Sequence, residues 1–230
     1  MSNPKLILFD IDGTLISTHG IPRQAMTAVL KRRYTGFSFD NGFNFSGRTD
    51  WEIIEHMLVF DRREVNRDLI FQIFDDFANE LEVQLLNGRI PTIYTGIEAL
   101  LSSLHQTKNV FLGLVTGNIQ RGARIKLQAA GLFNYFATGG FGDDSKDRND
   151  LPPIAIQRSE KLYNLKFKPD NTWIIGDSIY DIHCARANRL RCLAVSTGWT
   201  AYAELQQTLP DHLYKNLVDT PAIIELLLSD

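Results

Sequence analysis

The chain has 230 residues, of which 44% are hydrophobic and 22% charged, and its formal net charge is −3. This composition is ordinary for a soluble globular protein, and the charge gives no reason to expect nucleic acid or an anionic membrane as a partner. No apolar stretch is long enough to span a bilayer. The length allows one sizeable core with a smaller appended domain.

The start of the chain and its cysteines favour a cytoplasmic location. A first strand is expected to begin by Lys5, which leaves no room for a signal peptide before it. The two cysteines, Cys184 and Cys192, are too few for a disulfide framework or a cysteine metal site. We expect both to be small core residues in a reducing compartment.

The hydrophobic pattern changes character along the chain. The apolar run at residues 6–9 predicts a buried parallel strand. Helical periodicity then follows without a convincing strand, at residues 24–33, 51–60 and 67–86. From residue 96 onward, helices and strands alternate. Here helices are expected at residues 97–104, 120–130, 152–163, 179–188 and 220–228, and strands at residues 110–115, 135–138, 172–175 and 190–195.

This order of elements predicts an α/β fold, with a parallel sheet covered by helices on both faces. The all-helical block comes directly after the first strand, so we interpret it as a small cap domain inserted over the sheet. The predicted division places residues 1–17 and 88–230 in the core and residues 18–87 in the helical cap.

Two aspartates, Asp10 and Asp12, follow the first strand directly, and Gly13 and Thr14 come next. Two carboxylates crowded at a strand end repel each other unless a cation or a proton lies between them. The arrangement therefore indicates a metal site beside a carboxylate nucleophile. A plain turn after the strand is the alternative, because Asp and Gly both favour turns.

Three later segments also place polar residues after a predicted strand. Because the carboxyl ends of parallel strands open into one crevice, we expect these residues to meet there. They offer hydroxyl, backbone, cationic and carboxylate groups suited to phosphate and magnesium. The residues are Thr116, Gly117 and Asn118 in the first segment, Lys146 and Arg148 in the second, and Asp177 and Asp181 in the third.

In their order and spacing, the four segments resemble the motifs of the haloacid dehalogenase (HAD) superfamily. The match runs from Asp10 to Asp181 and so touches nearly the whole chain. The resemblance implies a Rossmann-like, HAD-like core with a C1-type helical cap. It is similar to the group that contains phosphoglycolate phosphatase and β-phosphoglucomutase.

The resemblance assigns a chemical role to each acidic residue of the motifs. Asp10 is implied to be the nucleophile that forms an aspartyl phosphate, and Asp12 the general acid and base. Asp177 would complete a Mg²⁺ site with the Asp10 carboxylate and the Asp12 carbonyl. Asp181 would act on the metal through water or would orient a basic residue.

The same resemblance implies a phosphate-binding set. Thr116 and the neighbouring backbone amides would hold the phosphoryl oxygens, with Gly117 allowing close approach and Asn118 orienting an amide. A cation is expected to steady the nucleophile and the transferring phosphoryl group. Arg148 has a proline five positions later, as the basic residue has in many relatives. It is preferred over the competing Lys146 because its guanidinium can bridge two carboxylates or phosphate oxygens.

Three residues outside the motifs are candidates for substrate binding. In C1-capped relatives, the cap region that corresponds to Arg48 and Thr49 faces the active site and contacts the substrate's non-phosphate end. Arg48 would bind a carboxylate or a second phosphate, and an exposed cation is the equal alternative. His19 lies in the segment leaving the site and is a candidate for its entrance.

The expected function is hydrolysis of a small phosphomonoester by a magnesium-dependent phosphatase. Asp12 separates the chain from dehalogenases, which lack this carboxylate because a halide leaves without a proton. A phosphomutase using the same groups is the nearest alternative, and a non-catalytic phosphometabolite-binding protein is a more distant one. A dinucleotide-binding oxidoreductase is disfavoured, because no G-x-G-x-x-G follows the first strand.

Overall fold

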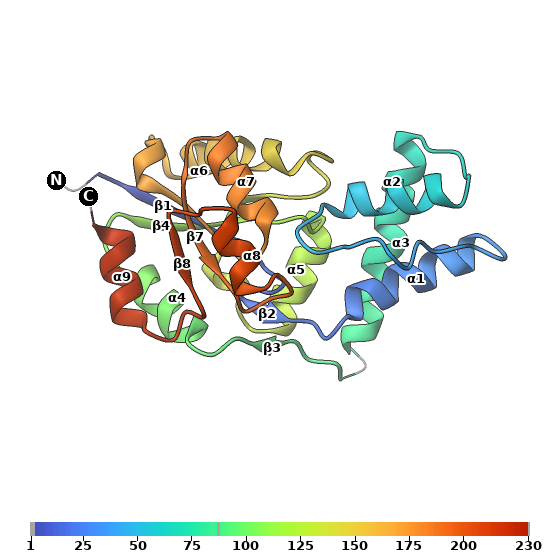
Figure 1. Ribbon diagram of the computed structural model, residues 1–230, viewed down its shortest axis with the longest axis horizontal. Coiled ribbons are helices and arrows are strands. Elements are labelled where there is room, and N and C mark those ends of the chain that lie inside the picture. The colour runs from blue at the N-terminus through green and yellow to red at the C-terminus, as the bar shows by residue number, and fades with distance from the viewer. Residues whose placement is uncertain (1–2, 87, 230) are drawn as a thin grey trace.

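The computed structural model describes residues 3–86 and 88–229 (Figure 1). In this part of the chain, a parallel sheet has the spatial order β5-β4-β1-β6-β7-β8. Its first strand lies in the middle, where Phe9 is in register with Leu114 on one side and Ile175 on the other. The strands are β1 (Lys5–Phe9), β4 (Val110–Val115), β5 (Gly139–Gly140), β6 (Thr172–Gly176), β7 (Arg191–Val195) and β8 (His212–Tyr214).

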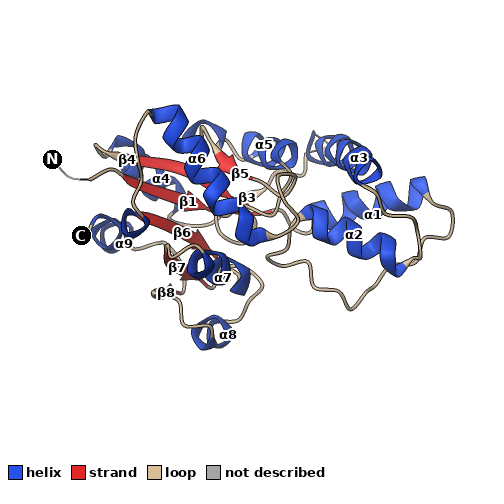
Figure 2. Cartoon of the chain, turned by 90° about the horizontal axis from the view of Figure 1, so that it is seen from above, coloured by secondary structure: helices blue, strands red, loops and turns tan. Residues whose placement is uncertain are grey.

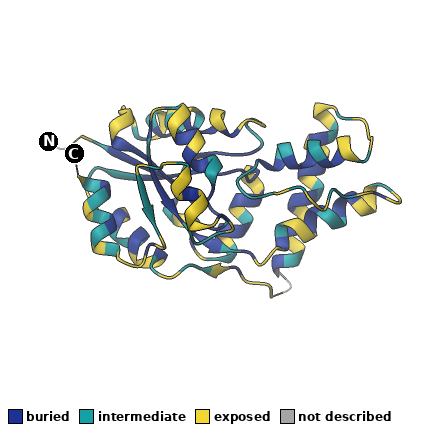
Figure 3. Cartoon of the chain, in the orientation of Figure 1, coloured by how far each residue is buried: buried dark blue, intermediate teal, exposed yellow. Residues whose placement is uncertain are grey.

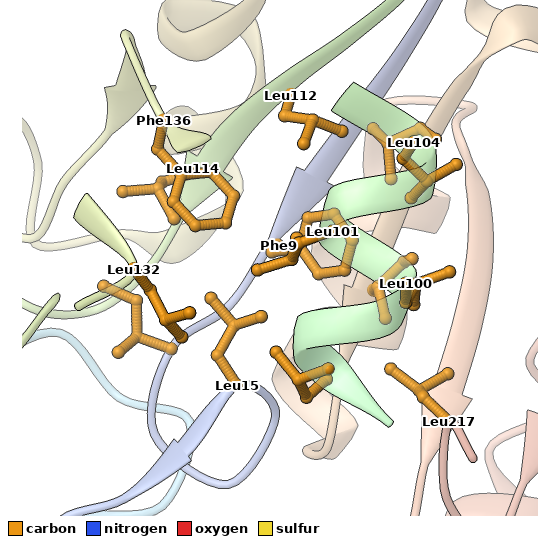
Figure 4. Packing of buried hydrophobic residues seen from close by; sticks show 14 of the residues in the cluster. Phe9, Leu15, Leu100, Leu101, Leu104, Leu112, Leu114, Leu132, Phe136 and Leu217 are labelled. Carbon is orange, nitrogen blue, oxygen red and sulfur yellow. The ribbon is translucent and has the colours of Figure 1, made fainter. Parts of the chain in front are cut away.

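Helices cover both faces of this sheet. Side chains along each strand alternate between the two sides, so both faces carry apolar residues that pack against helices. Ile7 and Phe9 pack in one apolar cluster, and Figure 4 shows Phe9 among the leucines of α4. Leu6 and Leu8 pack in another cluster on the opposite face. The first face carries α4 (Ile97–Gln106), α5 (Gln120–Ala129) and α9 (Thr220–Leu228), and the second carries α6 (Leu151–Tyr163), α7 (Ile179–Ala187) and α8 (Tyr202–Gln207). The predicted α/β fold class is confirmed.

The three remaining helices form a separate helical unit, at the end of the molecule away from the two chain termini (Figures 1 and 2). They pack around an apolar cluster of their own, which Ile119 of the sheet domain joins. A short antiparallel pair, β2 (Ile16–Ser17) and β3 (Thr92–Ile93), joins the two connections to this unit. The helices are α1 (Ile21–Arg33), α2 (Asp50–Phe60) and α3 (Arg67–Leu86). The domain division at residues 17 and 88 stays a prediction, and residue 87 lies outside the described residues.

One predicted strand is wrong. Residues 133–135 form a 3₁₀ turn instead, and Phe136 is buried edge-on against Phe9, with ring centroids 5.9 Å apart. The apolar residues of this segment therefore anchor a turn, and the edge strand is formed by Gly139 and Gly140. A Cβ atom at Gly140 would overlap the Leu151 carbonyl, so the close approach of α6 requires glycine here.

The burial pattern tests the prediction made for the two cysteines. Buried residues line the sheet and the inner faces of its helices (Figure 3). Cys184 and Cys192 are among them, as free thiols in α7 and β7, which confirms their prediction as core residues. Among the described residues, no helix combines the length and apolar character needed to cross a membrane.

Candidate active site

Three adjacent strands of the sheet bring the motif residues together. Asp10 follows β1, Thr116 follows β4 and Asp177 follows β6, and β1 pairs with both of the other strands. The sheet extends into these residues, because the Asp10 amide donates to the Ile175 carbonyl at 2.9 Å and the Thr116 amide to the Gly140 carbonyl at 3.1 Å. All three side chains are buried. The predicted meeting of polar residues at one sheet edge is therefore found.

Arg148 is the cation of this cluster. Its Nη2 lies 3.1 Å from Asp10 Oδ1 and 2.5 Å from Asp181 Oδ1, while its Nη1 donates to the Gly47 carbonyl at 2.9 Å. The competing Lys146 is 62% exposed, and its Nζ lies 3.3 Å from a carboxylate oxygen of Glu55. The structure thus brings Arg148, and not Lys146, to the aspartates.

Asp181 is fixed by the start of α7. Its Oδ2 accepts from the Ser178 amide at 3.0 Å, and its own amide donates to the Ser178 hydroxyl oxygen at 3.3 Å, which together form a capping box. The Ser178 hydroxyl also donates to Oδ2 at 2.6 Å. Its Oδ1 accepts from Arg148. Because both oxygens already have donors, this geometry supports the expected orienting role over direct ligation of a metal.

The acidic cluster fits a divalent cation. Asp10, Asp177 and Asp181 are buried, and one ligand atom from each lies within 4.8 Å of the others. Asp181, whose oxygens already have donors, would add charge close to the ion without ligating it directly. The three ionised carboxylates and the single charge of Arg148 sum to −2, which a dication would neutralise. Carboxylate oxygens are the ligands that Mg²⁺ prefers. The donor set of the cluster therefore fits a divalent metal ion, and its identity as Mg²⁺ stays a prediction.

Two glycines leave room for the Asp177 carboxylate. A Cβ atom at Gly13 or at Gly198 would overlap this group. Gly13 also has a φ of +88°, a conformation that few other residues adopt without strain. The turn after β1 is therefore shaped around the carboxylate that follows β6. The Thr14 hydroxyl, 163 positions away in the sequence, donates to this carboxylate at 3.3 Å.

The pKa values reflect this crowding of buried acids. Burial raises the pKa of Asp10 to about 6, against the opposing charge of Arg148. Burial, together with the negative charges of Asp10 and Asp181, raises the pKa of Asp177 well above its usual range. The protein alone therefore disfavours the fully ionised cluster, and a bound cation would restore it.

Asp12 has a cationic partner that the sequence did not reveal. Lys126 Nζ lies 2.6 Å from Asp12 Oδ2, which also accepts from Asn118 Nδ2 at 2.9 Å. Asp12 Oδ1 accepts from the Thr18 hydroxyl at 2.9 Å. Although burial acts to raise the pKa of Asp12, these three donors stabilise the carboxylate and hold that pKa below its usual value.

A signal for Lys126 was present in the sequence. The buried face of α5 contains Gly122, Ala123, Lys126 and Leu127, so the lysine occupies a position where the helical period calls for a small or apolar residue. Lysine is almost never fully buried without a partner. The identity of that partner, however, depends on tertiary structure.

The loop after β4 carries the predicted phosphate-binding residues. Asn118 Nδ2 donates to the Thr116 hydroxyl at 2.7 Å as well as to Asp12. Gly117 lies against the helical unit, since a Cβ atom there would overlap the Arg48 carbonyl. Its own carbonyl accepts from the Asp50 amide at 2.7 Å. Gly117 thus meets a close backbone approach, and its part in phosphate binding stays a prediction.

A cavity of about 450 Å³ opens above the aspartates, between the sheet domain and the helical unit. Arg148 and Lys126 lie at its base, and aromatic and cationic side chains from the helical unit form a wall. The residues of this cavity wall are Arg23, Met26, Phe43, Phe45, Arg48 and Ile53, with His19 and the exposed Trp199 also bordering the space. A larger hollow of about 620 Å³ beside β5 has no acidic residue among its described lining, so it offers no comparable chemistry.

The candidates in the helical unit separate in the structure. Arg48 borders the cavity, is ion-paired with Glu52 and stacks over Phe43 at 4.7 Å from the ring centroid. Thr49 is buried outside the cavity lining; its hydroxyl accepts from the Glu52 amide at 3.1 Å and donates to the Lys146 carbonyl at 2.9 Å. Its position fits the start of α2 and the contact between the two units.

The comparisons with known proteins agree with this geometry. A family model described as "Haloacid dehalogenase-like hydrolase" matches residues 7–195. The chain belongs to this family. It is 24% identical over 220 residues to the pyrophosphatase PpaX of Oceanobacillus iheyensis, covering 96% of each protein. It is also 25% identical to a phosphoglycolate phosphatase of Pseudomonas fluorescens, over 93% of this chain and 77% of the relative.

Solved structures show the same fold. CbbY from Rhodobacter sphaeroides, in complex with phosphate, superposes with a TM-score of 0.76 at 18% identity, covering 94% of this chain and 96% of CbbY. A predicted phosphatase from Clostridium acetobutylicum gives a TM-score of 0.69 at 23% identity, with 97% and 100% covered. The predicted family is confirmed, and with it the class of enzyme, a phosphoric monoester hydrolase of the haloacid dehalogenase type.

Proposed function

We propose that the protein is a magnesium-dependent phosphatase that hydrolyses a small phosphomonoester through an aspartyl phosphate on Asp10. The observation that carries this proposal is the meeting of Asp10 and Asp177, at the carboxyl ends of adjacent strands, with Arg148 from the turn that precedes α6. A nucleophile, a metal-binding set and an anion-stabilising cation then lie within one small volume, at the base of a cavity large enough for a small metabolite.

In the first step, a carboxylate oxygen of Asp10 attacks phosphorus, and the bond from phosphorus to the leaving oxygen breaks. Asp12 gives its proton to that leaving oxygen. The Thr116 hydroxyl and the amides that follow it hold the phosphoryl oxygens, while Arg148 keeps Asp10 in place. Two easier displacements thereby replace one difficult displacement.

In the second step, water attacks the phosphorus of the aspartyl phosphate, and the bond to Asp10 breaks to release inorganic phosphate. Asp12 accepts a proton from the attacking water. Its contacts with Lys126 and Asn118 favour the charged form that this step uses. Asp12 is then protonated again and ready for the next leaving group.

The carboxylates of Asp10 and Asp177, with the Asp12 carbonyl, are the groups proposed to hold Mg²⁺. When bound, the ion supplies positive charge that neutralises the phosphoryl oxygens and the crowded acids. Asp181 is proposed to act on this site through Arg148 and through water. Gly13 and Gly198 leave room for the Asp177 carboxylate. This supports a metal site that is built into the protein and does not depend on the substrate.

The helical unit is proposed to be a C1-type cap, with residues 18–87 over a core of residues 1–17 and 88–230. Its side chains form most of the cavity wall, so its closure would exclude bulk water and select the substrate. Two relatives are named a pyrophosphatase and a phosphoglycolate phosphatase, and one CbbY variant was solved with xylulose-1,5-bisphosphate. A small phosphorylated metabolite is accordingly the proposed substrate.

Phosphate release from a panel of phosphorylated metabolites tests the proposed function. We expect turnover with Mg²⁺, and a loss of roughly 10³-fold or more for Asp10→Asn, because the amide cannot form the phosphoenzyme. Asp170→Asn makes the same chemical change at an exposed position far along the chain and is the matched control. Near-normal release by Asp10→Asn would reject Asp10 as the nucleophile.

Thermal unfolding tests the metal site without relying on turnover. Because a ligand that binds the folded state stabilises it, Mg²⁺ should raise the melting temperature of the wild-type protein. The shift should vanish in Asp177→Asn and persist in Asp170→Asn. An equal shift in all three proteins would place the ion elsewhere.

The alternatives give different products in the same assay. A phosphomutase would return an isomerised sugar phosphate and little inorganic phosphate. A phosphometabolite-binding protein would bind a member of the panel and convert none. The contacts of Asp12 with Lys126 and Thr18 favour a catalyst, since binding alone needs no group for proton transfer.

A further inference from the structure

We propose that Lys126 is a positioning residue for proton transfer, which holds Asp12 and Asn118 in the arrangement that the hydrolysis of the aspartyl phosphate requires. The inference rests on the proposed function, because it assumes that Asp12 is the proton-transfer group. It adds a residue that lies outside all four sequence motifs, on the buried face of α5.

The burial of Lys126 is the first observation. The residue is only 1% exposed, and a lysine ammonium is very costly to remove from water unless a carboxylate compensates it. Its Nζ is 2.6 Å from Asp12 Oδ2. An apolar residue at this position of α5 would cost less free energy to bury. The position instead carries a charged group that contacts Asp12, the proposed proton-transfer residue.

The second observation is a closed triangle of hydrogen bonds. Lys126 Nζ donates to Asn118 Oδ1 and to Asp12 Oδ2, while Asn118 Nδ2 donates to that same Asp12 oxygen at 2.9 Å. Because Lys126 occupies the amide oxygen of Asn118, the amide nitrogen must face Asp12 and the Thr116 hydroxyl, 2.7 Å away. One buried ammonium thus sets the orientation of two side chains in the site.

The third observation is the direction from which Lys126 acts. The Asp12 side chain remains 34% exposed, whereas that of Lys126 is 2% exposed. Thr18, in the segment that enters α1, holds the other Asp12 oxygen at 2.9 Å. Lys126 therefore contacts the Asp12 carboxylate from the protein interior, and Thr18 contacts it from the side of the helical unit. The rest of the Asp12 side chain is open toward the cavity.

This placement resembles the Arg148 contact with Asp10 but serves a different step. Arg148 supports the group that bonds to phosphorus, and Lys126 supports the group that moves a proton. Lys126 also contributes positive charge at Asp50, in the first turn of α2. The competing explanation is that the Lys126 charge has only a structural role. The experiment must separate this structural role from a role in proton transfer.

A single-turnover experiment with 2,4-dinitrophenyl phosphate makes this separation. Dinitrophenolate leaves without needing a proton, so its release reports attack by Asp10 alone. Phosphate release reports the second step, which needs Asp12 as a base. For Lys126→Met we expect dinitrophenolate release within about threefold of wild type and phosphate release slowed by roughly 10- to 100-fold.

Variants on the same helix and in the same pair sharpen the result. Lys126→Arg keeps the charge and should recover most of the phosphate release. Arg124→Met removes a cation that stacks over Phe133 outside the site, and both of its rates should match wild type. Asp12→Asn/Lys126→Met removes both charges together and leaves no unpaired buried ion; it should be no slower than Asp12→Asn.

The outcomes distinguish this inference from the proposed function. Equal slowing of both releases by Lys126→Met, no slowing of either, or a further loss in the Asp12→Asn background would overturn the role of Lys126. Wild-type phosphate release by Asp12→Asn would instead reject the role of Asp12, and the inference would fall with it. Absence of turnover of any phosphoester by the wild-type protein would overturn both.

Discussion

The base and the wall of the cavity above the aspartates hold their cations differently. At the base, each cation is buried and ion-paired: Arg148 with Asp10 and Asp181, and Lys126 with Asp12. On the wall, Arg23 is exposed and lies over the Phe45 ring, 4.8 Å from its centroid. The cations at the base are therefore fixed by buried ion pairs, whereas Arg23 on the wall is held by a contact with an aromatic ring.

This difference follows from the energetics of the two environments. Removing one partner of a buried ion pair leaves an uncompensated charge and costs about 3–5 kcal/mol. An exposed cation over an aromatic ring is worth only about 0.5–1 kcal/mol. Groups at the base are therefore hard to replace, whereas the wall tolerates exchange.

The largest effect is expected at Arg148. Arg148→Met would leave Asp10 and Asp181 without their buried counter-ion and would remove charge stabilisation from the phosphoryl group. We expect phosphate release to fall by about 10³-fold and the free energy of unfolding without metal to fall by about 3 kcal/mol. Chemical denaturation and steady-state phosphate release measure the two losses.

Lys146→Met is the matched control for this prediction, since the two cations compete for one motif and lie two positions apart. Lys146 is exposed beside Glu55, and an exposed ion pair contributes about 0–1 kcal/mol. Its loss should leave both measurements close to wild type. Reversed results for the two variants would mean that the wrong cation has been assigned.

The next effect is expected where the helical unit meets the sheet domain. Asp50 begins α2, is buried, and accepts from the Ile119 amide at 2.8 Å. Burial raises the pKa of Asp50 to about 6, although the charge of Lys126 opposes the rise. Below the unfolded pKa of 3.8 the residue is neutral in both states. Between that value and pH 6 only the unfolded chain ionises, so the folded state loses stability as the pH rises.

Asp50→Asn keeps a side-chain acceptor for the Ile119 amide and removes this loss. Its free energy of unfolding should equal that of wild type near pH 4 and exceed it by about 2–3 kcal/mol above pH 7. Urea denaturation across this range provides the measurement, with the exposed Asp75→Asn as control. A gain that is independent of pH would show that the charge of Asp50 is not its cause.

Much of this arrangement was accessible from the sequence, because parallel-sheet geometry is simple. Once residues 6–9, 110–115 and 172–175 are strands of one sheet, Asp10, Thr116 and Asp177 must lie near one edge. Local patterns also predicted most helices to within a few residues at each end.

Prediction from the sequence failed where tertiary contacts decide the local structure or the partner of a side chain. Phe136 packs on Phe9, so an apolar run became a turn. Lys126 meets a carboxylate 114 positions away, which no local pattern reports. Thr49 has its hydroxyl engaged at the start of α2 and by the sheet domain. The short α8 and β8 went unpredicted, because a few residues carry little periodic signal.

The smallest effect is expected on the wall, where two arginines differ in their partners. Arg48 is ion-paired with Glu52, whereas no carboxylate among the described residues forms an ion pair with Arg23. If the substrate carries a second anionic group away from the reacting phosphate, Arg23 can bind it directly, and Arg48 must first exchange its partner. Arg23→Gln should therefore raise KM by about 10-fold and leave kcat unchanged, because uniform binding is lost.

Arg48→Gln should raise KM by only about 2- to 3-fold, since part of its charge is already neutralised. Both constants come from phosphate release with the best substrate of the panel and with an analogue that lacks the second anionic group. The analogue should be insensitive to Arg23→Gln. A fall in kcat for that variant would place Arg23 with the reacting groups at the base, and the contrast between fixed base and exchangeable wall would no longer hold.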